Sequence, residues 1–325
     1  MTRNLKAIVY LKVYAAAVCC FFAVMMITNW LVDPFNELKR NTIGLYFSTE
    51  RQAKSDIVKF PHDAVLLGSS KAGRINPKTL NCYTFYNASF DAAMPEEIYL
   101  YLKRYITHER LVMIELDFYM FNERQWPVHA MKEWPEQSFG KFEYLINFNT
   151  FKSSLFGVYK WYKKEPAVIA QNGQKIIADA ADRAVLVKQP REAPLKEVVH
   201  IKHDFSDWLA MLTNHHYRRY LFSQERLDIL RKIKSLLETK KVPYMIFMSP
   251  LNRHVYEMIM NSENKEIFIK WQREINAIFP GHVYDFSYSS YSLDDDNYGE
   301  RDPFHFHGEV GTKFLNSIIS CGDAP

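Results

Sequence analysis

An uncharged apolar run near the N-terminus constrains this chain more than any other feature. Val13–Val32, with the sequence VYAAAVCCFFAVMMITNWLV, holds 20 residues without a formal charge. At about 1.5 Å of rise per residue, a helix of that length crosses the ~30 Å hydrocarbon core of a bilayer. The sequence therefore predicts one transmembrane helix over 13–32.

A cleaved signal peptide is the competing interpretation of this run, because Ala15, Ala16 and Ala17 resemble a small-residue cleavage site. The apolar run continues for 15 residues beyond Ala17, which is typical of an anchor. Three basic residues precede the run, and the acidic Asp33 and Glu37 follow it. The positive-inside rule then predicts a cytoplasmic N-terminus over 1–12 and an extracytoplasmic remainder over 33–325.

The composition of the whole chain limits the classes of protein to which it can belong. The 325 residues are 48% hydrophobic, enough for a sizeable core in one large or two ordinary domains. The 41 Lys and Arg against 37 Asp and Glu give a net charge of only +4, and the basic residues are dispersed along the chain. We therefore expect no nucleic-acid partner.

The four cysteines suggest no zinc site, because the chain has no CxxC motif. Cys19 and Cys20 lie within the apolar run and are most simply apolar filler. Cys82 and Cys321 would both occupy an oxidising compartment under the predicted topology. Whether these two pair is left open, because spacing alone does not bring their Cα atoms together.

Beyond the anchor, short apolar runs alternate with helical patterns. This order predicts an α/β domain with a mostly parallel sheet. Five strands are expected, in the stretches that begin at Asp63, Cys82, Arg110, Val242 and His282. Helices are expected to begin at about residues 95, 223 and 308.

Between about residues 122 and 221 the alternation breaks down. We interpret this stretch as a partly helical insertion packed over one end of the sheet. It includes FKSSLFGVYKWYKK, whose aromatic residues either belong to a core or line a groove for sugars or lipid headgroups.

The stretch VLLGSSKAGRINP, residues 65–77, places Gly68-Ser69-Ser70 directly after an apolar strand. Ligands of open α/β sheets bind at the carboxyl ends of the strands. A serine just past a glycine there presents its hydroxyl at a strand-to-helix turn. Taken alone, the same residues are commonly a plain turn or a helix cap.

A second motif, RDPFHFHGEVG, lies between the last predicted strand and the last helix. It holds Asp302 and His305 three residues apart. A short loop with this spacing brings the carboxylate against one ring nitrogen and leaves the other nitrogen facing a serine hydroxyl.

A serine after the first strand and an Asp-x-x-His before the final helix resemble the SGNH (GDSL-type) hydrolase superfamily. The resemblance implies a flavodoxin-like three-layer α/β/α domain and no cofactor. It places Ser69 on the aspartate of the family's first block and Ser70 on the nucleophile. His305 takes the general-base role and Asp302 orients it.

The family's oxyanion-hole blocks are not evident in this chain. The third strand ends IELDFYMFN without the expected glycine and asparagine, and YNASFDAAMP stands in place of the second block. The oxyanion donors are therefore expected to be the N–H of Ser70 with contributions from Asn87 or Ala88.

The anchor, the Gly-Ser-Ser variant and the terminal DPFHFHGEVG resemble an envelope subgroup of this superfamily. That subgroup includes the D-alanine transfer protein of teichoic acid biosynthesis and the alginate O-acetyltransferases. The resemblance implies a single-pass protein of the bacterial inner membrane that transfers an acyl group, acetyl by default, to an extracytoplasmic polysaccharide. A membrane-bound O-acyltransferase is the implied acyl donor. An acylesterase and a catalytically inactive assembly or polysaccharide-binding component are the alternatives.

Three further residues are candidates for substrate binding, although each also has an ordinary structural explanation. Arg74 follows the proposed nucleophile closely enough to hold an anionic group. Asp117 ends the third strand, where a helix cap or an ion pair with an arginine is the competing explanation. His254 follows the fourth strand and is the least specific of the three.

A metal-dependent hydrolase is a separate hypothesis. Asp302, His305 and His307 together form an Asp-x-x-His-x-His pattern, and an extended His-x-His points both rings to one face. We favour the serine mechanism, in which the site holds no metal.

Overall fold

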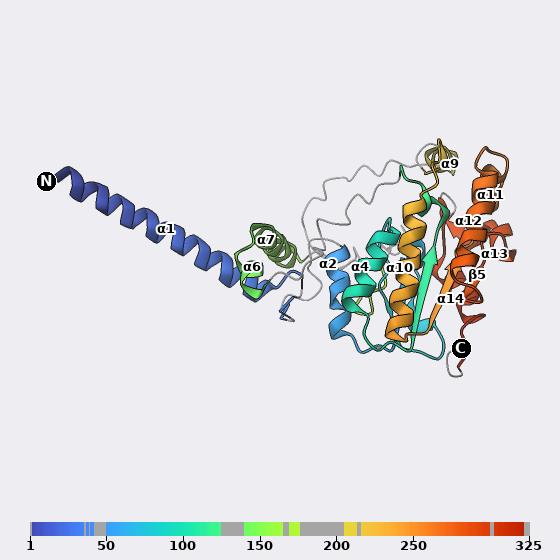
Figure 1. Cartoon of the computed structure of the whole chain (residues 1–325), viewed down its shortest axis with the longest axis horizontal. Helices are drawn as coiled ribbons and strands as arrows, with labels where there is room; N and C mark the ends of the chain where they lie inside the picture. Colours follow the sequence, from blue (N-terminus) through green and yellow to red (C-terminus); the bar gives the residue numbers. More distant parts are fainter. Residues whose placement is uncertain are drawn as a thin grey trace, which may run out of the picture. The chain divides into compact units, whose positions relative to one another are not determined.

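The computed structural model describes residues 2–35, 37–38, 40–41, 50–124, 140–164, 169–175, 205–212, 216–299 and 302–321. The chain divides into two compact units (Figure 1). Unit 1 comprises Met1–Val58 and Met131–Ala167, and unit 2 comprises Lys59–Ala130 and Val168–Pro325.

Unit 1 is built around the long N-terminal helix α1 (Thr2–Val32). Its segment Ala7–Val32 is long and apolar enough to cross a membrane, and nearly all of this segment is exposed. The helix expected from the uncharged run is confirmed.

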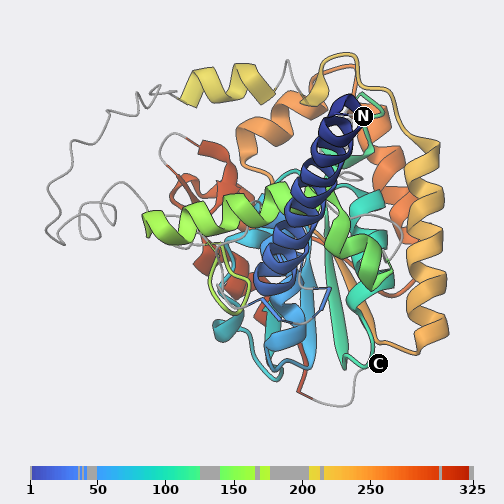
Figure 2. The same cartoon turned by 90° about the vertical axis from the view of Figure 1, so that its left-hand side faces the viewer.

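Two helices from the middle of the chain contact α1 (Figure 2). They are α6 (Lys141–Ile146) and α7 (Phe148–Lys163). The side-chain amide of Asn29 on α1 donates to the carbonyl of Leu145 at 2.8 Å, and the hydroxyl of Tyr144 donates to Asp33 at 2.8 Å. Buried polar bonds therefore join these helices to the end of α1.

The segment expected to form one insertion over about 122–221 is therefore divided. The helices α6 and α7 belong to unit 1, whereas α9 (Phe205–Leu212) belongs to unit 2. The physical reason is that α7 buries Thr150, Ser154 and Gly157, and such small side chains let two helices approach closely. Residues 176–204 lie outside the described residues.

Unit 2 contains a five-stranded sheet in which every neighbouring pair is parallel. The spatial order is β2-β1-β3-β4-β5. The strands are β1 (Ala64–Leu67), β2 (Phe85–Asn87), β3 (Leu111–Leu116), β4 (Tyr244–Met248) and β5 (Val283–Asp285). The first four are buried along their whole length, as continuous apolar runs between layers require. The α/β class and the parallel sheet expected from the sequence are confirmed.

Helices lie on both faces of this sheet (Figure 1). On one face, α4 (Pro95–Tyr105) and α10 (Gln224–Lys240) contact each other, and α10 also contacts α12 (Lys265–Ile278). On the other face, α14 (Gly308–Asn316) buries Val310, Phe314 and Leu315 against the sheet. The helices expected near residues 95, 223 and 308 are therefore confirmed.

Shorter elements connect these layers. They are α2 (Glu50–Ala53), η1 (Lys54–Lys59), α3 (Ser70–Gly73), η2 (Pro77–Thr79), η3 (Phe118–Phe121), α11 (Arg253–Met260), α13 (Ser290–Leu293), η5 (Asp295–Asn297), β6 (Tyr298–Gly299) and β7 (Asp302–Phe306).

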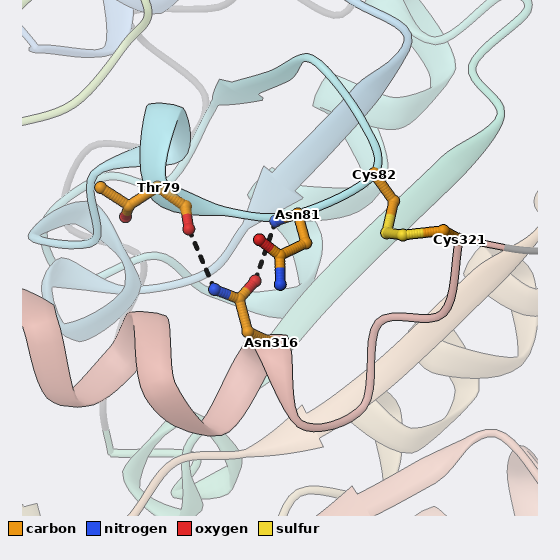
Figure 3. The surroundings of a disulfide bond; sticks show 5 residues. All are labelled: Thr79, Asn81, Cys82, Asn316 and Cys321. Carbon is orange, nitrogen blue, oxygen red and sulfur yellow. Dashed lines mark hydrogen bonds between the residues drawn. A yellow bond between two sulfur atoms is a disulfide. The ribbon is translucent and has the colours of Figure 1, made fainter.

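A disulfide between Cys82 and Cys321 ties the segment before β2 to the segment after α14 (Figure 3). Asn316 reinforces this junction, because its side chain donates to the Thr79 carbonyl and accepts from the Asn81 N–H, both at 2.9 Å. The pairing that the sequence left open is therefore present in the structure.

Candidate active site

Ser70 lies three residues beyond the end of β1, at the first position of the short helix α3. Gly68 makes this turn with φ +153°, a conformation that side chains rarely adopt. A Cβ at Gly68 would also lie 2.5 Å from the side chain of Glu115. Ser69 caps α3 by accepting the N–H of Lys71 at 3.2 Å. The two serines therefore occupy different positions, with Ser69 buried and Ser70 half-buried.

The structure brings together Ser70, His305 and Asp302, the three residues proposed from the sequence as catalytic. The Ser70 Oγ lies 2.8 Å from the His305 Nε2, across 235 residues of sequence. The His305 Nδ1 lies 2.7 Å from the Asp302 Oδ2. With a proton on Nδ1, the imidazole donates to Asp302 and its Nε2 accepts the serine hydroxyl.

Asp302 and His305 belong to a strand, not to the short loop expected from the sequence. Strand β7 pairs with β6 in an antiparallel ribbon, and its side-chain hydrogen bonds explain how residues three apart still meet. The Asp302 Oδ1 accepts the N–H groups of Phe304 at 3.1 Å and His305 at 3.2 Å. The Asp302 carboxylate therefore extends toward the residues that follow it in β7 and reaches the imidazole of His305.

A close backbone contact fixes the end of this strand against α3. Gly308 follows β7, and a Cβ there would lie 2.5 Å from the Arg74 carbonyl oxygen. Only glycine allows the two segments to approach this closely. The contact holds the strand that bears His305 beside the helix that begins with Ser70.

Arg74, proposed from the sequence to bind substrate, contacts the carboxylate of Asp302. Its Nη2 lies 3.2 Å from the Asp302 Oδ2, the same oxygen that faces His305. Both side chains are about one-fifth exposed, so the ion pair lies at the edge of the site. Arg74 therefore pairs with Asp302 in this structure, and its role in substrate binding stays a prediction.

Burial of the imidazole favours its neutral form. Burial lowers the pKa of His305, and Asp302 opposes that effect while Arg74 and Lys71 add to it. Burial alone would raise the pKa of Asp302, but the hydrogen bond from His305 and the charges of His305 and Arg74 lower it to about 2. At neutral pH the site thus holds an ionised carboxylate and an imidazole that is free to accept a proton.

Glu115, on β3, is hydrogen-bonded to the turn that carries the two serines. Its carboxylate accepts the Ser69 N–H at 2.5 Å and the Ser69 hydroxyl at 3.1 Å, and it also accepts the Ser249 hydroxyl at 3.0 Å. Complete burial, followed by repulsion from Asp117, raises the pKa of Glu115 to about 7. Glu115 therefore links the ends of β1, β3 and β4 directly behind Ser70.

Asp117 forms a buried ion pair and does not face an open cleft. Its Oδ2 lies 2.6 Å from the Nζ of Lys71, and both side chains are almost fully buried. The Lys71 Nζ also lies 4.2 Å from the centre of the Phe304 ring. The prediction that Asp117 binds substrate is therefore wrong in this structure, and its partner is Lys71, not an arginine.

Asn87 and Ala88 do not have N–H groups available for an oxyanion. The Asn87 amide donates to the carbonyls of Ala72 and Ile75, both at 2.9 Å. The Ala88 N–H donates to the Leu66 carbonyl at 2.7 Å. These donors are used to hold α3 and β1, which corrects the expectation for both residues. The Ser70 N–H, at the first position of α3, has no acceptor among the described residues.

The two remaining histidines named from the sequence, His254 and His307, also have hydrogen-bond partners. His254 is half-buried in the first turn of α11, where its N–H donates to the Asn252 side chain at 2.9 Å. Its role in substrate binding stays a prediction. His307 is exposed, and its Nε2 lies 3.1 Å from the Tyr298 carbonyl oxygen. Within the described ranges, no group of three His, Cys, Asp or Glu side chains is placed to hold a metal ion.

Lys71 and Glu115 were not among the site residues predicted from the sequence, although the sequence around each gives a reason to consider it. Glu115 interrupts a continuously apolar strand, and a carboxylate in such a strand needs buried partners. Lys71 follows the serines directly, but its partner Asp117 is 46 residues further on. The Lys71–Asp117 ion pair therefore depends on the pairing of β1 with β3, which the local sequence does not indicate.

No protein-family model matches this sequence, and no curated protein matches it either.

Proposed function

We propose that this protein is a membrane-anchored, serine-dependent O-acyltransferase of the SGNH type that acts on an extracytoplasmic envelope polysaccharide. The observation that carries the proposal is the Ser70–His305–Asp302 array, with distances of 2.8 and 2.7 Å. Residues from the first strand-to-helix turn and the last strand meet in the order that the resemblance implies. The parallel order β2-β1-β3-β4-β5 also supports it, because this is the order of flavodoxin-like sheets.

In the first half-reaction, the Ser70 Oγ attacks the carbonyl carbon of an acyl donor while the His305 Nε2 takes the hydroxyl proton. The resulting oxyanion accepts the Ser70 N–H. The carbon–leaving-group bond then breaks, His305 returns the proton to the leaving group, and the acyl group remains as an ester on Ser70. Asp302 holds the imidazole in the required tautomer and stabilises its protonated form.

In the second half-reaction, His305 removes the proton of an acceptor hydroxyl, which attacks the acyl-serine carbonyl. The bond from the acyl carbon to the Ser70 Oγ breaks, and the serine regains its proton from His305. With a sugar hydroxyl as acceptor the product is an O-acylated polysaccharide. With water as acceptor the same residues give an esterase, which is the second candidate function.

The membrane assignment rests on α1 and on the disulfide. A helix of this length and apolarity supports a single-pass anchor, and the preceding basic residues favour a cytoplasmic N-terminus. Disulfides persist in oxidising compartments, so the Cys82–Cys321 bond supports a periplasmic or other extracytoplasmic unit 2. We propose the bacterial inner membrane as the location and a membrane-bound O-acyltransferase as the donor of the acyl group.

The test compares O-acylation of the envelope polysaccharide in cells that carry the native chain or Ser70→Ala. Loss of the O-acyl groups in the Ser70→Ala cells is expected, with the protein present at native abundance. Retained O-acylation would refute the serine mechanism. An increase in O-acylation in the same cells would favour the esterase.

A further inference from the structure

Helix α7 presents two chemically different faces. The face on α1 buries three small or polar residues, Thr150, Ser154 and Gly157. The Ser154 hydroxyl donates to the Asn29 Oδ1 of α1 at 2.9 Å. The helix is therefore held to α1 by close packing and by a buried hydrogen bond.

A second face of α7 is apolar and exposed. Phe148, Leu155, Tyr159 and Tyr162 are spaced by seven, four and three residues, which aligns them in one stripe along the helix. Their exposed fractions are 64%, 50%, 50% and 73%. We name these four residues the α7 stripe. Large apolar side chains that are exposed in a row mark a contact surface and not a core.

Lysines flank the α7 stripe. Lys152 and Lys163 are exposed on the adjoining side of the helix, and the Lys163 Nζ lies 5.8 Å from the centre of the Tyr159 ring. The Lys160 Nζ similarly lies 5.1 Å from the Phe156 ring. Aromatic side chains bordered by lysines are typical of helices that lie in a membrane interface.

The hydrogen bond to Asn29 sets the level of α7 along α1. Asn29 lies three residues, about 4.5 Å, before the end of the apolar run at Val32. Interfacial helices embed their apolar face about 5–10 Å into the boundary between headgroups and acyl chains. The contact between the Phe21 and Phe151 rings, 6.2 Å apart, lies on the side of Asn29 toward the middle of α1. A helix fixed at this level has lipid beside it.

We propose that α7 lies in the outer interface of the bilayer, with the α7 stripe among the acyl chains and its lysines at the phosphates of anionic phospholipids. The inference rests on the proposed anchoring by α1, and it does not depend on the serine chemistry. The occupant of this surface is thus a lipid bilayer.

The test uses the full chain reconstituted alone in vesicles of phosphatidylcholine with or without phosphatidylglycerol. Cys19→Ser and Cys20→Ser remove the free thiols of α1, and the structural disulfide stays oxidised. A polarity-sensitive fluorophore is attached at Tyr159→Cys in the stripe or at Asn149→Cys, an exposed position on another side of the same helix. Lipid-borne nitroxides and aqueous iodide then serve as quenchers.

We expect the Tyr159→Cys label to be quenched several-fold more by lipid nitroxides than the Asn149→Cys label, and iodide to show the reverse. Phosphatidylglycerol should increase the difference in lipid quenching between the two labelled positions. The double variant Lys152→Ala with Lys163→Ala should make this effect of phosphatidylglycerol smaller. Equal iodide quenching at both positions would overturn the proposal. A Tyr159→Cys label shielded from both quenchers would show that a second copy of the chain covers the stripe, which also overturns it.

The acylation of Ser70 is measured in the same vesicles. Because that reaction does not involve α7, acylation without lipid quenching contradicts only the interfacial helix. Lipid quenching without acylation contradicts only the proposed function. Release of the whole chain from the vesicles by alkaline carbonate would refute the anchor and, with it, the interfacial position of α7.

Discussion

The Asp302 Oδ2 is shared by two cationic or potentially cationic groups, His305 and Arg74. This sharing gives Arg74 an electrostatic effect on His305, the proposed general base. The guanidinium keeps the carboxylate ionised and disfavours a second positive charge on the imidazole. Because Arg74 acts on the imidazole through Asp302, it is a positioning residue.

The variant Arg74→Ala should move the acid limb of the pH–activity profile to higher pH. His305 must be neutral to accept the serine proton, so activity falls as the pH drops below the pKa of His305. Removing the Arg74 charge removes one cause that lowers this pKa, so we expect the acid limb to move to higher pH. Arg74→Lys keeps the charge and should keep the limb in place. An unchanged limb in Arg74→Ala would contradict the electrostatic role.

Lys71 and Asp117 form a second ionic contact, which is buried behind the serines. Lys71→Met keeps most of the side-chain volume but leaves the Asp117 carboxylate buried without its partner. We expect a loss of roughly 3–5 kcal/mol in the free energy of unfolding. Adding Asp117→Asn should recover part of that loss, because the amide carries no charge. Chemical denaturation measures both variants.

The exposed Lys232→Met on α10 is the matched control, with an expected change within about 0.5 kcal/mol. If Lys71→Met were no more destabilising than Lys232→Met, the ion pair would not be a stabilising contact of unit 2.

At the scale of elements, α14 connects β7, which carries Asp302 and His305, to the C-terminal disulfide. Gly308 at its start contacts the Arg74 backbone, and Asn316 at its end bonds the segment around η2. Cys321 then joins Cys82, 239 residues earlier in the chain. The helix is thus held at both ends beside the turn that carries Ser70.

Replacing both disulfide cysteines, Cys82→Ser with Cys321→Ser, should lower the free energy of unfolding by about 2–4 kcal/mol. A crosslink that closes so long a loop restricts the unfolded chain strongly. Cys19→Ser with Cys20→Ser is the matched control, because these thiols are free and exposed on α1. Thermal unfolding with and without reductant checks the expectation. Equal unfolding of the two double variants would contradict it.

The sequence predicted correctly the elements whose own residues, within a short stretch, indicate that they are buried. Continuous apolar runs marked β1, β3 and β4, and the Ser223 cap marked the start of α10. The strand β7 was missed because Asp302 and Pro303 resemble a loop, and its partner β6 has only two residues. The contact of α7 with α1 depends on small residues, which carry no hydropathy signal.

The same distinction applies to the site: residues in short motifs were predicted, whereas contacts between distant segments were not. Ser70, Asp302 and His305 were found because each lies in a short motif. Asn87 was assigned wrongly because an asparagine at the end of a strand looks like an available donor, whereas its amide donates to carbonyls in and just after α3. Contacts between segments that are distant in sequence decided which polar groups were already occupied.

At the scale of the whole molecule, the chain combines a helix long and apolar enough to cross a membrane with a domain that holds the Ser70–His305–Asp302 array. These two properties belong to separate compact units. The proposed acyl transfer uses residues of unit 2 alone, and its direct test is whether Ser70 carries an acyl group during turnover.

The most direct measurement is the mass of the purified full chain after brief exposure to an activated acetyl ester, followed by peptide mapping. We predict one acetyl group on the peptide that contains Ser70. Ser69→Ala should still form this adduct, because the Ser69 hydroxyl bonds Glu115 and not His305, whereas Ser70→Ala should form none. His305→Ala should slow adduct formation by at least about 10²-fold, the loss typical of a missing general base. Equal labelling of the native chain and Ser70→Ala, or no acetyl group on the Ser70 peptide, would contradict the account.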